Sequence, residues 1–331
     1  MPGSREAHSD VEMLTRERVR AAARFLEGRV RRTPLEPSPG LSEMAGVPVS
    51  LKLENLQETG SFKVRGAFLR LAELAPEERR RGVVTASAGN HGKAVAHVAR
   101  LSGIPARIFV PKTVDEAKYR AMVAMGADVV RCEFPGYDET EELARAEAAA
   151  SGRVFLSAFD DDAIMAGNGG SLAFETLEDA PDAGTFLLPV GGGGLAGGFA
   201  YYAREERPGC RIVGCQHALS PALKLSLERG AAVTKLPAIE TAAAGVEGGI
   251  GVSNFEVLKD RVDVVALLTE EEILDGVRWV LDRHQYLIEP SAAVAVAAIR
   301  TGKAGPMSTP AVAVLSGRNV SLETLRKILR G

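Results

Sequence analysis

The sequence predicts an α/β protein with two interleaved lobes, each built on a parallel β-sheet. Short β-branched runs alternate with Ala-, Leu-, Glu- and Arg-rich helical segments from residue 82 onward. This alternation is typical of parallel strands joined by right-handed crossovers. The chain has 331 residues, of which 46% are hydrophobic and 5% aromatic. It is therefore long enough for two lobes of roughly 100–200 residues each.

Seven strands are expected, and each is followed by a helical pattern. They are GVVTAS (82–87), ARIFVP (106–111), DVVRC (128–132), TFLLPV (185–190), RIVGCQ (211–216), VDVVALL (262–268) and AVAVLS (311–316). Seven units exceed what one compact open sheet needs, and no Pro- or Ser-rich linker separates two halves, so the lobes are expected to interleave. Ligands of open α/β sheets lie beyond the carboxyl ends of the strands. Motifs at those ends are therefore the candidates for a site.

Charge and cysteine content exclude several classes of protein. The net charge of −3 gives no basic footprint for nucleic acid. Three cysteines without a CxxC pair favour a reducing cytosol. The first ten residues are polar and no apolar run approaches ~18 residues, so neither a signal peptide nor a membrane span is expected. Histidines lack ligand spacing, the acidic run 160–162 is expected to cap a helix, and no metal site is predicted.

The stretch ETGSFKVRGAF, residues 58–68, places a lysine at a helix start. With Ser61 as the N-cap, Lys63 falls in the first turn, where the helix dipole disfavours a cation. Phe62 and Val64 favour desolvation, which also lowers a lysine pKa. A neutral amine is the form that attacks an aldehyde to make a Schiff base. The alternative is an ordinary lysine that extends from a half-buried helix to solvent.

Four consecutive glycines, Gly191 to Gly194, follow a predicted strand and precede a helix in LPVGGGGLAGG. Their bare amides at a helix N-terminus are suited to a phosphate group. The same segment also satisfies GxGxxG, the dinucleotide fingerprint, which needs an acidic residue ~20 positions on. The next strand ends instead in Cys215 and Gln216. A single phosphate therefore fits better than a dinucleotide.

Three further strand or helix ends carry polar groups. SAGNHG, residues 87–92, offers small polar side chains and backbone N–H groups before a helix expected to begin near Lys93, and suits a carboxylate or phosphate. A helix-capping turn is the alternative for this loop. Ser316 follows the last strand, where its hydroxyl can meet a heterocyclic nitrogen or simply cap a turn. Glu289 begins an Ala/Val-rich helix, where a carboxylate suits the dipole.

These components together are those of a pyridoxal phosphate site, and the sequence resembles a known family. It is similar to the fold-type II pyridoxal phosphate enzymes, in the threonine/serine dehydratase and serine racemase branch. The matching motifs, in order, are LKLENLQETGSFKVRGAF, TASAGNHG, PVGGGGLAGG, SPALKLSLERG, IEPSAAVAVAA and LSGRN. The resemblance runs from about Arg31 to the C-terminus. It implies a tryptophan synthase β-like fold with a large cofactor-binding domain (1–73 and 158–331) and a small mobile domain (74–157).

The resemblance also implies the roles of individual residues. Lys63 corresponds to the Schiff-base lysine, Asn90 to the residue that bonds the phenolic oxygen of the cofactor, and Ser316 to the partner of its pyridine nitrogen. The expected cofactor contacts are Phe62, Lys63, Asn90, Gly191, Gly192, Gly193, Gly194, Leu195, Gly245, Glu289 and Ser316. The expected contacts of the substrate carboxylate are Ser87, Ala88, Gly89, Asn90 and His91.

The activity implied is α,β-elimination of water from a β-hydroxy amino acid, with L-threonine or L-serine first, to give a 2-oxo acid and ammonia. Lys63 is expected to act as general base. The alternatives are a 3-hydroxyaspartate or other β-hydroxy amino acid dehydratase, a β-replacement enzyme, and a catalytically reduced relative that only binds the cofactor. The expected partner is a small amino acid, with neither nucleic acid nor membrane, and the expected protein is a cytoplasmic homodimer.

Several positions depart from the family pattern. Ala88 stands where serine racemases carry a second serine, so racemisation is not expected. Gln216 replaces a metal-ligating glutamate and Ala244 replaces the usual aspartate. Arg318 in LSGRN, with GGIGVSN at 248–254, resembles the hydroxyectoine-utilisation dehydratase. No ACT-type regulatory domain, and so no control by isoleucine, is expected.

Overall fold

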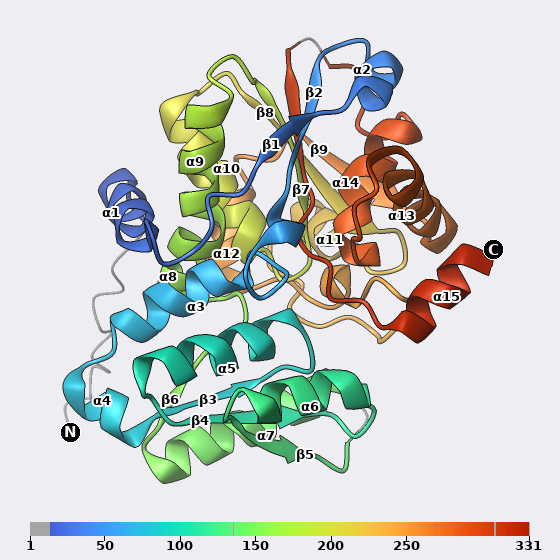
Figure 1. The fold of residues 1–331 in the computed structure, drawn as a ribbon. Coiled ribbons are helices and arrows are strands. Elements are labelled where there is room, and N and C mark those ends of the chain that lie inside the picture. Colours follow the sequence, from blue (N-terminus) through green and yellow to red (C-terminus); the bar gives the residue numbers. More distant parts are fainter. Residues whose placement is uncertain (1–13, 135, 308, 331) are drawn as a thin grey trace.

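The computed structural model describes residues 14–134, 136–307 and 309–330 of the chain, which fold into two lobes with one β-sheet each (Figure 1). The polar N-terminal stretch, for which no signal peptide is expected, lies outside the described residues. The predicted α/β class with two parallel sheets is confirmed. All seven predicted strands are present, and each occupies most of its predicted segment.

The larger sheet has six strands in the order β1-β2-β10-β7-β8-β9. Their bounds are β1 Leu35–Pro37, β2 Val49–Lys52, β7 Thr185–Pro189, β8 Arg211–His217, β9 Val264–Leu268 and β10 Ala311–Val314. Only β1 runs antiparallel to its neighbour, and the other pairs are parallel. The last strand in sequence, β10, therefore lies between the early strand β2 and β7, with Ala313 opposite both Leu51 and Leu187.

Both faces of this sheet are buried, as the continuous apolar character of its strands predicts. Along β10, Val312 and Val314 belong to one hydrophobic core, whereas Ala311 and Ala313 belong to a second core on the opposite face. The helices of this lobe are α1 Arg16–Leu26, α2 Pro39–Ala45, η1 Glu54–Leu56, α8 Asp162–Met165, η2 Ala166–Gly170, α9 Ser171–Asp179, α10 Gly194–Glu206, α11 Ala222–Arg229, η3 Ala244–Val246, α12 Val252–Leu258, α13 Glu270–His284, α14 Pro290–Arg300 and α15 Leu322–Arg330. Across the described ranges, no helix is both long and apolar enough to cross a membrane.

The smaller sheet has four parallel strands in the order β5-β4-β3-β6. Its elements are α4 Pro76–Arg81, β3 Val83–Ala86, α5 Asn90–Ser102, β4 Ala106–Val110, α6 Glu116–Ala124, β5 Asp128–Arg131, α7 Tyr137–Ser151 and β6 Val154–Phe155. Helix α3, Lys63–Ala72, packs against α5 through Val64, Ala67 and Leu71, which share a core with β3. The division of the chain into domains at residues 74 and 157 stays a prediction.

Two predicted helix starts are wrong by a few residues. Ser61 is not the N-cap of α3, because Phe62 occupies that position and the Ser61 hydroxyl is buried without a partner among the described residues. The cause is a long-range pairing, since Ser61 forms an isolated β-bridge with Gly317. Helix α5 begins at Asn90 rather than near Lys93. The acidic run behaves as predicted, because the Asp161 side chain caps α8 by accepting from Ile164 N at 3.0 Å.

A buried ionic cluster fastens α3 to the large lobe. Arg65 is 2% exposed and donates through Nη2 to Glu54 Oε1 and Glu175 Oε2, both at 2.8 Å. Lys52 Nζ lies 2.7 Å from the other oxygen of Glu175. Desolvating these charges is costly, but each is matched by an opposite charge at hydrogen-bond distance. The cluster ties the helix that begins with Lys63 to β2, η1 and α9.

Replacing Arg65 by leucine is expected to lower the free energy of unfolding by about 3–5 kcal/mol, because Glu54 would remain buried without its counter-ion. Chemical denaturation with full fitting of the midpoint and slope measures this change. The matched control is Arg120→Leu, which removes an exposed pair with Glu116 on α6 and is expected to change the free energy of unfolding by less than ~1 kcal/mol. Equal effects of the two substitutions would contradict the role assigned to the cluster.

Candidate active site

The predicted site residues lie at the carboxyl ends of three parallel strands and at the start of α3. The glycine loop follows β7, Ser316 follows β10, and Asn90 follows β3 in the small lobe. Two contacts join these segments: Phe62 N donates to Ser316 O at 3.2 Å, and Asn90 Nδ2 donates to Glu289 Oε1 at 2.6 Å. Segments far apart in sequence therefore meet between the two lobes (Figure 1).

Lys63 is the first residue of α3, and its amine is buried in the protein. Its Nζ donates to Ala158 O at 2.7 Å and lies 5.2 Å from the centre of the Phe62 ring. Although the residue keeps some accessible surface, burial of the amine lowers the pKa of Lys63 to about 8, and the nearby charge of Glu289 opposes this shift. The predicted direction of the pKa shift is confirmed, with desolvation as the main cause.

The glycine loop presents amide groups that have no partner in the described part of the protein. The N–H groups of residues 191–195 make no hydrogen bond to any described residue, although Gly193 to Leu195 are buried. The loop cannot carry side chains, because a Cβ at Gly191 would collide with Gly245 O and one at Gly192 with the Phe159 ring. Buried donors of this kind, at the N-terminus of α10, require an acceptor from a ligand, and an anion suits them best.

Asn254 and Phe159 both contact the glycine loop at Gly192. Sequence reasoning did not identify either residue. Asn254 Nδ2 donates to Gly192 O at 2.6 Å and to Phe159 O at 3.0 Å. The Gly193 backbone has φ +95°, and a Cβ there would lie 2.8 Å from Asn254 Cβ. A signal existed in the motif GGIGVSN, which ends at Asn254, but its spacing gives no reason to connect it with residues 191–194.

A chain of polar side chains crosses between the lobes. Asn90 donates to Glu289, Asn319 Nδ2 donates to Asn90 Oδ1 at 2.6 Å, and Lys93 Nζ donates to Asn319 Oδ1 at 2.8 Å. Burial raises the pKa of Glu289 to about 7, while the hydrogen bond from Asn90 and nearby lysines, Lys118 first among them, act against the increase. Sequence reasoning placed Asn90 and Glu289 separately and missed Asn319 as the link between them.

In the loop of residues 87–91, the groups available to a ligand belong to the backbone more than to the side chains. Ser87 Oγ accepts from Gly89 N at 3.2 Å, so this amide is already paired. The His91 ring is 3% exposed and contacts Thr85 Oγ1 through Nε2 at 3.1 Å. Burial lowers the pKa of His91 to about 3, so the ring is neutral. Ala88 brings no polar side chain to the loop.

Ser316 and Gly245, two further predicted cofactor contacts, differ in whether they have a hydrogen-bonding group free for a ligand. Ser316 is 4% exposed, and its hydroxyl makes no hydrogen bond within the described ranges of the chain, which leaves it available to a ligand. Gly245 does not offer its amide, because Gly245 N donates to Ser291 Oγ at 2.8 Å. Its carbonyl instead faces Gly191.

Gln216 has the contacts of a structural residue. Its Nε2 donates to Val190 O at 3.4 Å, and its Oε1 accepts from Lys224 N at 3.2 Å. Among the residues described, no three His, Cys, Asp or Glu side chains gather closely enough to hold a metal ion.

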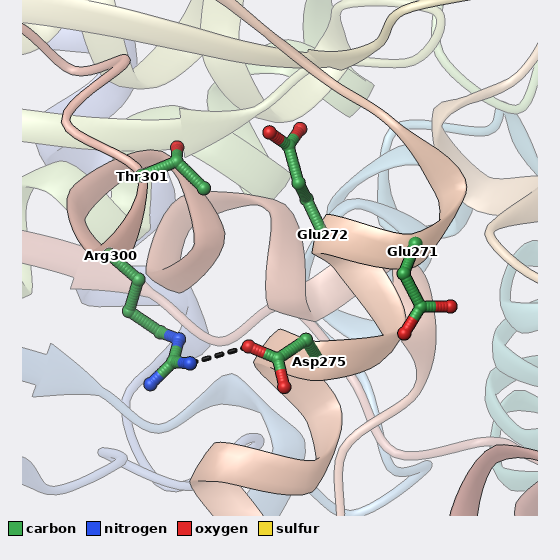
Figure 2. A pocket seen from close by; sticks show the side chains of 5 residues that line it. All are labelled: Glu271, Glu272, Asp275, Arg300 and Thr301. Carbon is green, nitrogen blue, oxygen red and sulfur yellow. Dashed lines mark hydrogen bonds and ion pairs between the residues drawn. The ribbon is translucent and has the colours of Figure 1, made fainter. Parts of the chain in front are cut away.

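An open hollow of about 280 Å³ lies elsewhere, on α13 and α14, and Figure 2 shows its lining. The lining residues are Glu271, Glu272, Asp275, Arg300 and Thr301. Arg300 Nη2 pairs with Asp275 Oδ2 at 2.5 Å, and Glu272 pairs with Lys303, so these charges are neutralised on the surface. None of the predicted site residues lines this hollow.

The residues between the lobes fit a phosphorylated aromatic aldehyde. A desolvated amine suits the aldehyde, unpartnered amides suit the phosphate, and the free hydroxyl of Ser316 suits a ring nitrogen. Such a site, on two parallel sheets, defines an α/β enzyme of the class that uses this cofactor. Residues 26–317 match the family described as pyridoxal-phosphate dependent enzyme, and the chain belongs to that family.

Relatives that are named for their enzymatic activities match nearly the whole chain. An L-threonine ammonia-lyase of Geobacter sulfurreducens is 38% identical over 318 residues, which are 96% of this chain and 78% of the relative. The serine racemase of Homo sapiens is 34% identical over 88% of this chain and 86% of its own. The crystal structure of a threonine deaminase from T.th. superposes with a TM-score of 0.85 at 33% identity, covering 92% of this chain and 98% of that one.

Capture of pyridoxal phosphate by the cofactor-free protein is expected to speed up with pH and to level off above pH ~8. The neutral amine is the reactive form, and the pKa of Lys63 is about 8 instead of the ordinary 10.5. Stopped-flow absorbance at each pH measures the rate constant. An inflection near 10.5 would contradict the desolvation of the amine, and Lys63→Ala serves as the control that lacks the absorbance change.

Glu289→Gln is expected to move that inflection to lower pH. The carboxylate, with a pKa of about 7, is charged at pH 8 and raises the pKa of Lys63, so its neutralisation removes this support. Glutamine keeps an oxygen that can accept from Asn90. The exposed Glu240, replaced by glutamine, is the control for a simple loss of net charge. If the inflection of the Glu289 variant lay at the same pH or at a higher pH, the electrostatic coupling between Glu289 and Lys63 would be refuted.

Proposed function

We propose that the protein is a pyridoxal phosphate-dependent ammonia-lyase that eliminates water from a β-hydroxy amino acid, with L-threonine or L-serine as the first candidates. The observation that carries this proposal is the neutral hydroxyl of Ser316 at the end of β10, where a carboxylate would keep a ring nitrogen protonated. A hydroxyl gives a weaker electron sink. Elimination tolerates this, because departure of the β-hydroxyl removes the electron pair from Cα.

The residues divide the work in a simple way. When bound, the cofactor withdraws electron density from the substrate Cα and weakens its C–H bond. The amides of residues 191–195 hold the phosphate, and the N–H groups of Ala88, Asn90 and His91, which have no partner among the described residues, receive the α-carboxylate. Lys63, with a pKa of about 8, is partly neutral at physiological pH and accepts the Cα proton. The β-hydroxyl needs one proton to leave as water, and the proton taken from Cα balances this need. The released enamine is hydrolysed in water to a 2-oxo acid and ammonia.

The fate of the proton distinguishes elimination from racemisation. Racemisation needs a second acid on the opposite face of the substrate, and the loop 87–91 offers the methyl group of Ala88 where a hydroxyl would be required. His91, the imidazole of this loop, is buried and neutral and so does not supply that acid. The relatives include an ammonia-lyase and a serine racemase, and Ala88 and His91 support the lyase reaction for this chain.

We further propose that residues 74–157 form a small mobile domain that closes over the substrate. Its contacts across the cleft include exposed or polar ones, such as the Lys235–Glu142 ion pair at 3.2 Å and the Asn90–Glu289 hydrogen bond. We also propose that the protein is a homodimer, because of the family resemblance. A cytoplasmic location is proposed because the three cysteines are free and buried, as in a reducing compartment.

Replacing Lys63 by alanine is expected to lower kcat for 2-oxobutanoate release from L-threonine by at least about 10²-fold, because the variant lacks the base that takes the Cα proton. Coupled detection of the 2-oxo acid measures the rate, and Lys303→Ala, on the surface, is the control. Chiral chromatography of L-serine reactions is expected to show no D-serine. Undiminished turnover by the Lys63 variant would overturn the mechanism.

A further inference from the structure

A short segment, residues 157–160, connects the two lobes, and we call it the connecting segment. It leaves β6 of the small sheet and leads into α8 of the large lobe (Figure 1). Leu156, just before it, is fixed to the small sheet, because its N–H donates to Val84 O and its carbonyl accepts from Thr85 Oγ1, both at 2.8 Å. Asp161, just after it, caps α8. The two ends of the connecting segment are therefore held by different lobes.

Ser157 shapes the connecting segment into a turn. Its Oγ accepts from Asp160 N at 3.0 Å and, at the longer distance of 3.4 Å, from Phe159 N. A serine hydroxyl in this position replaces a backbone acceptor and fixes the turn. The Ala158 carbonyl takes no part in these bonds and accepts from Lys63 Nζ at 2.7 Å. The turn formed by Ser157 thus determines where the acceptor of the lysine amine lies.

The rest of the connecting segment is bound next to the glycine loop. The Phe159 ring fills the space that a Cβ at Gly192 would need, and Phe159 O accepts from Asn254 Nδ2 at 3.0 Å. Asn254 Nδ2 also donates to Gly192 O. The Asp160 carboxylate accepts from the first two N–H groups of α12, at 3.1 and 3.0 Å. The same four residues therefore contact both the amine and the loop proposed to hold the phosphate.

The acceptor that holds the Lys63 amine is electrically neutral. Within the described residues, no carboxylate lies within 4.0 Å of Lys63 Nζ, and Glu289 acts on the amine only at longer range. A carboxylate at hydrogen-bond distance would favour the ammonium form, whereas a carbonyl accepts from an amine and from an ammonium alike. Ala158 O can therefore keep its bond while Lys63 changes between its two forms.

An ordinary serine turn after a strand is the plain alternative. Such a turn satisfies its own backbone groups, and a nearby lysine bonds to a free carbonyl. That reading requires no contact between the turn and the glycine loop. Here Phe159 and Asp160 are both bonded to the segment that holds this loop, and Ser157 aligns the carbonyl between them and β6 with Lys63. These contacts favour a role in the site.

We propose that Ser157 is a positioning residue that acts through the Ala158 carbonyl to orient the free amine of Lys63 toward the substrate Cα. This inference rests on the proposed lyase function. A neutral amine has two N–H groups and one lone pair, so a bond from one N–H to Ala158 O restricts the direction of the lone pair.

The orientation matters in the step that removes the proton. The lone pair of Nζ takes the Cα proton, the electron pair of the Cα–H bond forms the Cα–Cβ double bond, and the β-hydroxyl leaves as water with one proton. The ammonium formed at Lys63 still donates to Ala158 O. The base therefore need not reorient during the step, and a correctly held reacting group lowers the barrier.

The kinetic test uses the holoenzyme with L-threonine. Ser157→Ala is expected to lower kcat for 2-oxo acid release about 10-fold and to change KM less than ~2-fold, because the amine is misplaced while the contacts of the substrate remain. Ser157→Thr keeps the hydroxyl and is expected to restore kcat. Ser151→Ala removes an exposed hydroxyl that donates to Glu147 O shortly before β6, and it is the matched control.

Capture of aldehydes by the cofactor-free full-length chain separates this inference from the lyase proposal. Stopped-flow absorbance follows bond formation with pyridoxal phosphate and with pyridoxal, which lacks the phosphate. Ser157→Ala is expected to slow both reactions by the same factor, about 10-fold, because it acts on the amine. Asn254→Ser, which loosens the glycine loop, is expected to slow the capture of pyridoxal phosphate more than that of pyridoxal.

Slower capture of both aldehydes by Ser157→Ala, with recovery in Ser157→Thr, supports the positioning role even if no β-hydroxy amino acid is turned over. In that case only the lyase proposal fails. Wild-type capture of pyridoxal by Ser157→Ala, or an equal loss in the alanine and threonine variants, would overturn the inference.

Discussion

The insertion of β10 between β2 and β7 is the constraint on which the site depends. It carries the last part of the chain into the middle of the sheet, where Phe62 N donates to Ser316 O and Arg318 N to Gly60 O. The start of α3 is therefore built on the end of β10. Without this pairing, the amine of Lys63 and the hydroxyl of Ser316 would belong to unrelated segments. The parallel register delivers both to one edge of the sheet, as expected for ligand sites in α/β folds.

The electrostatics of the cleft follow from the same arrangement. Burial drives the pKa of Lys63 down and that of Glu289 up, and both values lie within about one unit of neutrality. Each group opposes the shift of the other, so neither is driven to a permanently neutral form. A lysine that titrates near neutral pH can both give and take a proton, which is what bond formation with an aldehyde and abstraction of a Cα proton require. The ionic cluster around Arg65 is fully paired, and it holds the helix without adding a free charge to the cleft.

The sequence was sufficient for elements whose signals are local. Long β-branched runs predicted all seven of their strands, and glycine and polar motifs at strand ends predicted the segments that meet. Strands β1, β2 and β6 were not predicted, because their segments lack the strand–helix alternation that marked the other seven, and β2 and β6 pair with strands that are distant in sequence. Ser61 failed as an N-cap for the same reason, since Gly317 pairs with it. The bonds that join Lys93, Asn319, Asn90 and Glu289 span about 200 residues, and no local pattern encodes them.

The separation between the amine and the glycine loop is set by backbone contacts, and the GNGG segment at 167–170 explains how. Helix α3 begins with Lys63 and α10 begins within the glycine loop, and both pack against η2, a π-helical turn. A Cβ at Gly167 would lie 2.7 Å from Gly66 Cα, and one at Gly169 would collide with Leu195 O. Asn168 Oδ1 accepts from Gly66 N at 2.8 Å, which secures the first of these contacts. Glycine permits such close approach, and main-chain contacts lack the rotamer freedom of side chains. A cofactor that was bonded at one end to Lys63 and held at the other by the loop amides would need this fixed distance, and Gly167 and Gly169 are the two residues that permit it.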